Sequence, residues 1–152
     1  MTPEGAFRVA NTVALAGWIV LVFFGRSRWV SGLLTGLVLP LLLAVAYSAI
    51  LIAHWGESAG NFSSLAGVSA LFANRWLLLA GWIHYLAFDL FIGSWQVRDS
   101  IRNRIPYLAV VPCLVLTFLF GPAGLLLYCI LRAGLRMTVA RSIAERSWIL
   151  ES

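Results

Sequence analysis

The sequence contains no lysine and few other ionisable residues. Eleven arginines carry all of the basic charge and stand against six acidic residues, which gives a net charge of +5. Without a lysine amine the chain cannot hold retinal as a Schiff base, so that class of membrane pigment is excluded. Two histidines and two cysteines are too few and too widely spaced for a zinc site. Cys113 and Cys129 stand sixteen residues apart, about 24 Å along a helix, and so cannot pair with each other.

Charged residues make up only 11% of the chain, whereas 61% of its residues are hydrophobic. A water-soluble domain of 152 residues does not need such a composition for its core, so we predict an integral membrane protein. The length allows one domain, which we take as residues 1–152. The arginines fall at the ends of apolar segments, a placement typical of contact with lipid headgroups and not of nucleic-acid binding.

Four long apolar segments predict four transmembrane helices. We expect them over residues 7–24, 29–54, 75–97 and 107–132, in an all-α bundle with both termini on one side. Pro40 is expected to kink the second helix, and the sequence FGPAG (Phe120–Gly124) to bend the fourth. The segment Phe62–Phe72 is too short to span and is expected to lie at the interface, and residues 133–152 are expected to form an amphipathic basic tail. With six arginines on one side and five on the other, the positive-inside rule leaves the orientation undetermined.

The third segment carries ionisable residues at membrane depth. Between the aromatic anchors Trp76 and Trp95 lie His84, Tyr85 and Asp89. An aspartate near the centre of a transmembrane helix costs about 2.5 to 3.5 kcal/mol on insertion, so such a residue marks a functional site unless it is paired for structure. His84 and Asp89 are five residues apart, about 140° around the helix axis. We therefore expect them to flank a ligand or to contact two different neighbouring helices.

Structural roles remain open for the same residues. A lone intramembrane histidine such as His84 is often satisfied by a carbonyl or hydroxyl group of a neighbouring helix. Asp89 could be held by tyrosine or tryptophan donors, or by an arginine, purely for packing. Trp82 and Trp95 are equally typical of packing and interfacial anchors.

Two stretches resemble one known family of small membrane proteins. They are LLAGWIHYLAFDLFIG, within residues 62–95, and GPAGLLLY, which ends at Tyr128. The resemblance covers roughly residues 6–132 and is to the neoxanthin-synthase-like family, also called the abscisic-acid-deficient-four-type family, of four-helix membrane proteins. Its plant members are needed to form neoxanthin, a step that opens a carotenoid 5,6-epoxide to an allenic alcohol. This short chain without a transit peptide is similar to bacterial members, which implies a multi-pass protein of a bacterial inner membrane.

The resemblance implies a membrane enzyme that isomerises a lipophilic polyene without net oxidation or reduction. Such a reaction needs an acid at the epoxide oxygen and a base at a carbon-bound proton, and the candidate catalytic residues are His84, Asp89 and Tyr85. An aromatic groove suits a polyene, and the candidate substrate-binding residues are Trp82, Phe88, Trp95, Asn11, Tyr47 and Tyr128. No cofactor or metal is required. The expected partners are the lipid bilayer and a carotenoid-like ligand, and formation of a homo-oligomer is left open.

Two other functions remain open from the sequence. His84, with His54 as a second axial ligand, would suit a b-type haem, although the sequence has no haem-attachment motif. A non-catalytic carotenoid- or retinoid-binding or assembly protein would use His84 and Asp89 only to stabilise the bundle. An absorption spectrum separates these functions, because haem gives a Soret band and a polyene gives a structured band in the blue.

Overall fold

The computed structural model describes the backbone of residues 1–151 and the side chains of residues 1–137. All regular structure in this range is helical, which confirms the all-α prediction. The elements in chain order are α1 (Pro3–Phe24), the π-helix η1 (Trp29–Val38), α2 (Leu39–His54), the 3-10 turn η2 (Trp55–Glu57), α3 (Leu65–Ala73), α4 (Arg75–Arg102), α5 (Tyr107–Phe120) and α6 (Pro122–Glu151).

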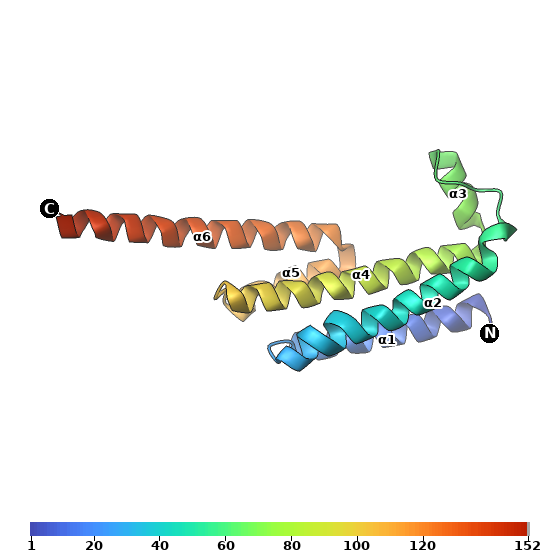
Figure 1. Ribbon diagram of the computed structural model, residues 1–152, viewed down its shortest axis with the longest axis horizontal. Helices are drawn as coiled ribbons and strands as arrows, with labels where there is room; N and C mark the ends of the chain where they lie inside the picture. Colours follow the sequence, from blue (N-terminus) through green and yellow to red (C-terminus); the bar gives the residue numbers. More distant parts are fainter. Residues whose placement is uncertain (152) are drawn as a thin grey trace.

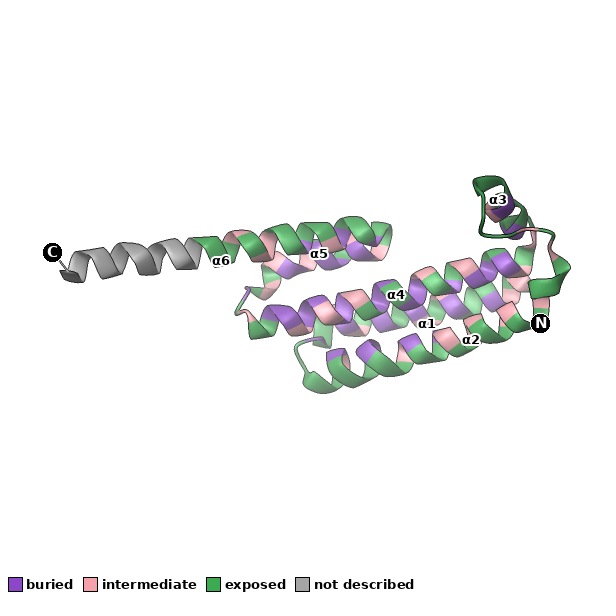
Figure 2. Cartoon of the chain, turned by 45° about the horizontal axis from the view of Figure 1, so that its top comes forward, coloured by how far each residue is buried: buried purple, intermediate pink, exposed green. Residues whose placement is uncertain are grey.

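Three helical stretches in the described chain are long and apolar enough to cross a membrane: Pro3–Phe24, Trp29–Glu57 and Arg75–Arg102. They lie side by side along one direction, with α4 packed against both α1 and α2 (Figure 1). In the apolar stretch of α4, 56% of the residues are buried, against 28% in the first span and 11% in the second. Helix α4 is therefore the core of the bundle. The second span turns most of its surface outward, as the green faces of α2 show (Figure 2).

Short polar side chains begin these helices. Thr2 caps α1 and Asn74 caps α4, each through a side-chain oxygen that accepts hydrogen bonds from the first turn of the backbone. Such caps satisfy donors that have no partner within the helix. An ion pair between Arg75 and Glu4 joins the two capped ends. We call this end of the molecule the amino-terminal end of the bundle.

The second span changes its winding next to Pro40, where a kink was expected. Pro40 stands at the beginning of α2, and the ten residues before α2 are wound as the π-helix η1. The guanidinium group of Arg98 on α4 donates a hydrogen bond to the carbonyl of Ser31 in this wider helix. A neighbouring helix thus satisfies a carbonyl of the distorted segment, which a bilayer interior requires. The non-spanning element before α4 is the nine-residue helix α3, which packs against α4.

The expected fourth span is not a continuous helix. Helix α5 ends at Phe120, Gly121 has a positive φ of 38°, and α6 starts at Pro122 and runs back beside α5 (Figure 1). The pairing is antiparallel, because Gly124 lies against Thr117 while residues 132 and 136 lie beside residues 103–106. The fourteen residues of α5 measure about 21 Å, which is less than the ~30 Å hydrocarbon layer. Four spans are therefore not confirmed, and α5 and α6 form a helical hairpin.

The hairpin changes where the chain goes after α4. The start of α5 and the part of α6 around residues 132–136 lie with the loops 25–28 and 103–106, at the end of the bundle opposite Thr2. We call this the arginine-rich end. Met137, the last residue with a described side chain, therefore lies at the arginine-rich end, whereas Thr2 lies at the amino-terminal end. Over the described side chains, the expectation that both ends of the chain share one side is wrong. Most of the expected amphipathic tail, residues 133–152, lies beyond those described side chains.

Candidate functional site at the hairpin tip

One face of α4 carries the candidate site. Leu78, Trp82, Tyr85 and Asp89 follow the spacing of four, three and four residues that places side chains on a single helical face. Asp89 is fourteen residues from the start of α4 at Arg75, or about 21 Å, and so lies near the middle of the span. Beyond Asp89 the same face is covered by the hairpin. Before it, the face borders a groove.

Asp89 meets the tip of the hairpin. Gly121 at the turn is buried, and a Cβ atom added to it would lie 2.7 Å from Oδ1 of Asp89. The aspartate is only 8% exposed, and its Oδ2 has no hydrogen-bond partner among the described residues. None of the ion pairs among the described residues includes Asp89. A buried carboxylate oxygen without a partner is costly, so the arginine-paired structural role considered for Asp89 has no support here.

Tyr85 joins α4 to the end of α5. Its hydroxyl group donates a hydrogen bond of 3.2 Å to the carbonyl of Phe118. In a continuous helix that carbonyl would accept from the residue four positions later, which is Pro122 and has no N–H. The hydrogen bond from Tyr85 therefore satisfies an acceptor that the hairpin turn leaves free. One turn separates this tyrosine from Asp89, so both side chains lie at the tip.

A groove borders the same face of α4 at the amino-terminal end of the bundle, and Trp82 forms the end of its lining that is nearer to the tip. A cavity of about 330 Å³ between α1 and α4 is lined by Pro3, Glu4, Phe7, Arg75, Leu78, Leu79 and Trp82. The ring of Trp82 lies 5.8 Å from that of Phe7 and 5.4 Å from that of Tyr85. Asn11 accepts a hydrogen bond of 3.1 Å from the indole nitrogen of Trp82 and fixes the ring. Trp82 and Asn11, two of the predicted binding residues, thus meet beside the groove.

His84 lies on a different face of α4. Its ring stacks on Phe88 at 4.5 Å and tilts against Tyr47 of α2 at 5.7 Å. It is exposed and borders a second cavity of about 330 Å³, which α2, α3 and α4 enclose with several aromatic rings. The predicted catalytic set is therefore divided: Tyr85 and Asp89 lie together at the tip, whereas His84 lies with Phe88 and Tyr47 in the second groove.

The two histidines do not share a site. Nδ1 of His54 is 2.8 Å from Oε2 of Glu57, and its ring stacks on Trp76 at 4.8 Å. Trp76 and His84 are eight residues apart on α4, about 12 Å along its axis, so His54 and His84 lie too far apart to ligate one iron. The residues do not fit a bis-histidine haem. Within the described chain, His, Cys, Asp and Glu side chains form no cluster that could hold a metal ion.

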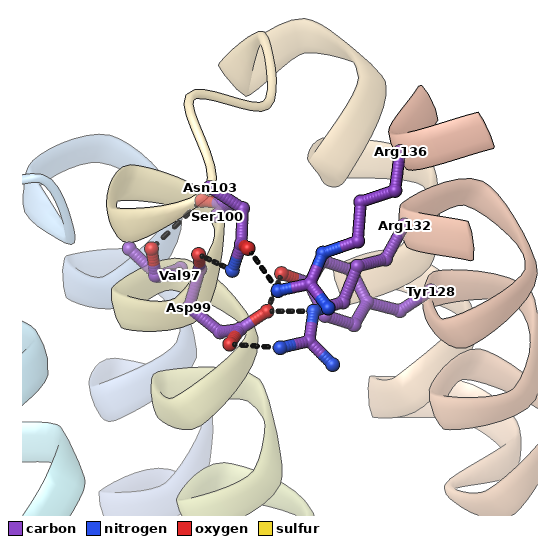
Figure 3. A network of polar contacts seen from close by, with 7 residues as sticks. All are labelled: Val97, Asp99, Ser100, Asn103, Tyr128, Arg132 and Arg136. Atoms are coloured by element: carbon purple, nitrogen blue, oxygen red, sulfur yellow. Dashed lines mark hydrogen bonds and ion pairs between the residues drawn. The ribbon is translucent and has the colours of Figure 1, made fainter. Parts of the chain in front are cut away.

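Tyr128 and Trp95 lie below the tip, toward the arginine-rich end. Tyr128 is fully buried, and its hydroxyl group donates to Oδ2 of Asp99 at 2.7 Å (Figure 3). Arg132 of the same helix donates to Oδ1 of Asp99 at 3.0 Å. Trp95 packs edge-on against the tyrosine ring with 5.5 Å between the ring centroids. These two predicted binding residues hold the hairpin against α4 and do not border either groove.

A second buried polar contact was not found from the sequence. Gln96 donates a hydrogen bond of 2.9 Å to the hydroxyl group of Thr117 on α5, and both side chains are fully buried. Gln96 and Asp99 continue the polar face that contains Asp89, at spacings of seven and ten residues. This continued polar face could have predicted the contact, because polar groups at membrane depth require partners on a neighbouring helix.

The model of the ABA4-like family, described as ABA DEFICIENT 4-like, matches residues 5–128 of this chain. The chain belongs to the ABA4-like family. The match extends from α1 through both arms of the hairpin as far as Tyr128, and so includes Asp89 and Gly121. Membership of the ABA4-like family and the three apolar spans support a membrane protein with a carotenoid-related role. No curated protein and no solved structure matched the chain.

Proposed function

We propose that this ABA4-like protein isomerises an epoxide end group of a carotenoid-like polyene at Asp89, within the membrane. One observation carries the proposal: a buried carboxylate with an unpartnered oxygen lies on the face of α4 that borders the groove, seven residues beyond Trp82. Intramembrane carboxylates that are not paired for structure are usually functional. The family supports the polyene, and a multi-pass position in a bacterial inner membrane is part of the same proposal.

The groove suits a long apolar ligand. Phe7, Trp82 and Tyr85 present a row of rings along this face. Aromatic faces give such a ligand a large contact area at little cost in conformational entropy. An end group that enters past Trp82 then reaches the carboxyl of Asp89, and the hairpin tip stops it from passing farther.

The chemistry can be completed by one carboxyl group. The protonated oxygen of Asp89 gives its proton to the epoxide oxygen as the carbon–oxygen bond breaks, and the other oxygen takes a proton from the adjacent carbon as the allene forms. Atoms and electrons balance, because the proton lost from carbon restores the acid. Tyr85 positions the carboxyl and excludes water at the tip. His84 takes no part in proton transfer, since it lies on another face of α4.

The test is conversion of a carotenoid 5,6-epoxide by the purified protein in lipid vesicles. Asp89→Asn keeps the shape of the side chain but removes the acid, and we expect a fall of roughly 10² to 10⁴ in rate with the melting temperature nearly unchanged. His84→Gln is the matched control on the same helix and should retain activity. Conversion by Asp89→Asn at the wild-type rate would contradict the assignment. Binding without conversion by the wild-type protein would contradict an isomerase and favour a carotenoid-binding protein.

A further inference from the structure

The hairpin gathers basic side chains at one end of the molecule. Nine arginines have described side chains, and seven of them lie at the arginine-rich end: Arg26, Arg28, Arg98, Arg102, Arg104, Arg132 and Arg136. Arg8 and Arg75 lie at the amino-terminal end, where Glu4 pairs with Arg75. A continuous fourth span would have carried Arg132 and Arg136 to the opposite side. With the hairpin, the positive-inside rule gives an orientation: the arginine-rich end faces the cytoplasm.

A pocket at this end lies between α6 and the loop 103–106, which joins α4 to α5. It has a volume of about 450 Å³, and its lining consists of Asn103, Arg104, Ile105, Pro106, Arg132, Leu135 and Arg136. Three guanidinium groups therefore border one cavity. The nearest acidic group is Asp99, whose carboxylate binds Arg132, so two positive charges are not neutralised by side chains of the described chain.

Two of the three arginines have side-chain partners before any ligand arrives. Arg132 is fixed by Asp99, and Arg136 donates to the side-chain oxygen of Asn103 (Figure 3). Asn103 is fixed in turn, because its amide donates to the backbone carbonyl of Asp99 at 2.8 Å. Arg104 follows with a positive φ of 54°, a left-handed conformation that a non-glycine residue rarely adopts. Preorganised guanidinium groups lose little entropy on binding a phosphate, which they contact with paired N–H donors.

We propose that this pocket binds the headgroup phosphate of an anionic phospholipid from the cytoplasmic leaflet. Clusters of arginine near the cytoplasmic surface of a membrane attract the negative headgroups of anionic lipids. The position favours a lipid over a free anion, because the pocket lies where α4 ends and the bilayer surface begins. Ile105, Pro106 and Leu135 add an apolar wall on which the glycerol and the first acyl carbons can pack.

The test counts lipids bound to the full-length protein in neutral detergent by native mass spectrometry. The probes are phosphatidylglycerol, phosphatidylcholine and inorganic phosphate. We expect one tightly held phosphatidylglycerol on the wild-type protein. Arg104→Gln and Arg136→Gln should each weaken it by about fivefold, since each removed charge near the surface is worth ~1 kcal/mol. Arg8→Gln, at the amino-terminal end, is the control and should bind as the wild type does.

Three outcomes would overturn the assignment. Equal retention of phosphatidylcholine would show that the lipid charge is not recognised. Inorganic phosphate that displaces phosphatidylglycerol at similar concentration would show a site for free anions. Undiminished binding by both variants would place the lipid elsewhere. Both arginines are exposed, so we expect the melting temperatures of the variants to match that of the wild type.

Discussion

The turn at Gly121 is the position where a single methyl group should do the most harm. Gly121 has φ +38° and ψ −93°, a conformation that an L-residue avoids. Its missing Cβ would stand 2.7 Å from Oδ1 of Asp89, which is closer than the van der Waals distance. Gly121→Ala therefore combines backbone strain with a steric overlap at the centre of the candidate site.

The expected loss of stability is the sum of the backbone strain and the steric overlap. A left-handed backbone costs an alanine about 1 to 2 kcal/mol relative to glycine. Displacing a packed group by one added methyl typically costs a further ~1 to 3 kcal/mol, and the low end applies because the carboxyl of Asp89 can rotate. We expect Gly121→Ala to lower the unfolding free energy by about 2 to 3 kcal/mol and to reduce epoxide conversion.

Denaturant titration in detergent micelles, with helical circular dichroism as the signal, measures this effect. Gly32→Ala is the control, because a Cβ at Gly32 meets nothing within 4 Å. The pair Asp89→Ala and Gly121→Ala forms a double-mutant cycle that separates the two terms. Removing the carboxyl relieves the overlap but not the backbone strain, so the double variant should be more stable than additivity predicts, by about 1 kcal/mol.

The reasoning would be refuted if Gly121→Ala were as stable as Gly32→Ala. Such a result would mean that residue 121 does not adopt a positive φ and that α5 and α6 do not reverse there. If Gly121→Ala is destabilised but the double-mutant cycle is strictly additive, the turn at Gly121 is supported and the contact of Gly121 with Asp89 is contradicted.

Two further predictions concern the hairpin. Asp99→Asn should lower the unfolding free energy by about 2 to 3 kcal/mol, because Arg132 loses its counter-charge; the cost stays below that of a fully buried pair since the Arg132 side chain is 30% exposed. A loss below ~0.5 kcal/mol in the same titration would contradict the role of this pair. Pro122→Ala should change stability by less than ~1 kcal/mol and leave activity intact, because proline at the first position of a helix removes no hydrogen bond. Loss of conversion in Pro122→Ala would show that the ring itself shapes the tip.

The sequence predicted the long helices because their signals are local. Apolar segments of sufficient length, bounded by arginine and aromatic residues, locate α1, the second span and α4. The division of polar residues between two faces of α4 also followed from helical periodicity alone. It correctly separated His84 from Asp89, since one contacts Tyr47 of α2 and the other meets Gly121.

The reversal at Gly121 could not be obtained in the same way. The segment 107–132 has the length and the hydropathy of a span, and FGPAG is compatible with either a bend or a turn. The difference lies in tertiary contacts. Asp99 binds Tyr128 and Arg132, and Gln96 binds Thr117, and these pairs hold both arms of the hairpin against one half of α4.

The expected role of Tyr128 depended on that missed reversal. In a straight fourth span, Tyr128 would have risen to the depth of His84, near the amino-terminal end. In the hairpin, Tyr128 lies nearer the arginine-rich end, where it binds Asp99 and packs against Trp95. The reversal thus moved Tyr128 from the predicted groove to a contact with Trp95 on α4.

An absorption titration tests the central claim, that the groove beside Trp82 leads a polyene to the hairpin tip. The purified protein is titrated with a carotenoid 5,6-epoxide, and the shift of the polyene band gives the affinity. The account predicts that Trp82→Ala weakens binding at least tenfold, since it removes the ring between Phe7 and Tyr85, the equivalent of about 1.4 kcal/mol. It predicts that His84→Ala, in the second groove, binds as tightly as the wild type. Loss of binding in His84→Ala with full binding in Trp82→Ala would contradict the account and place the ligand between α2, α3 and α4.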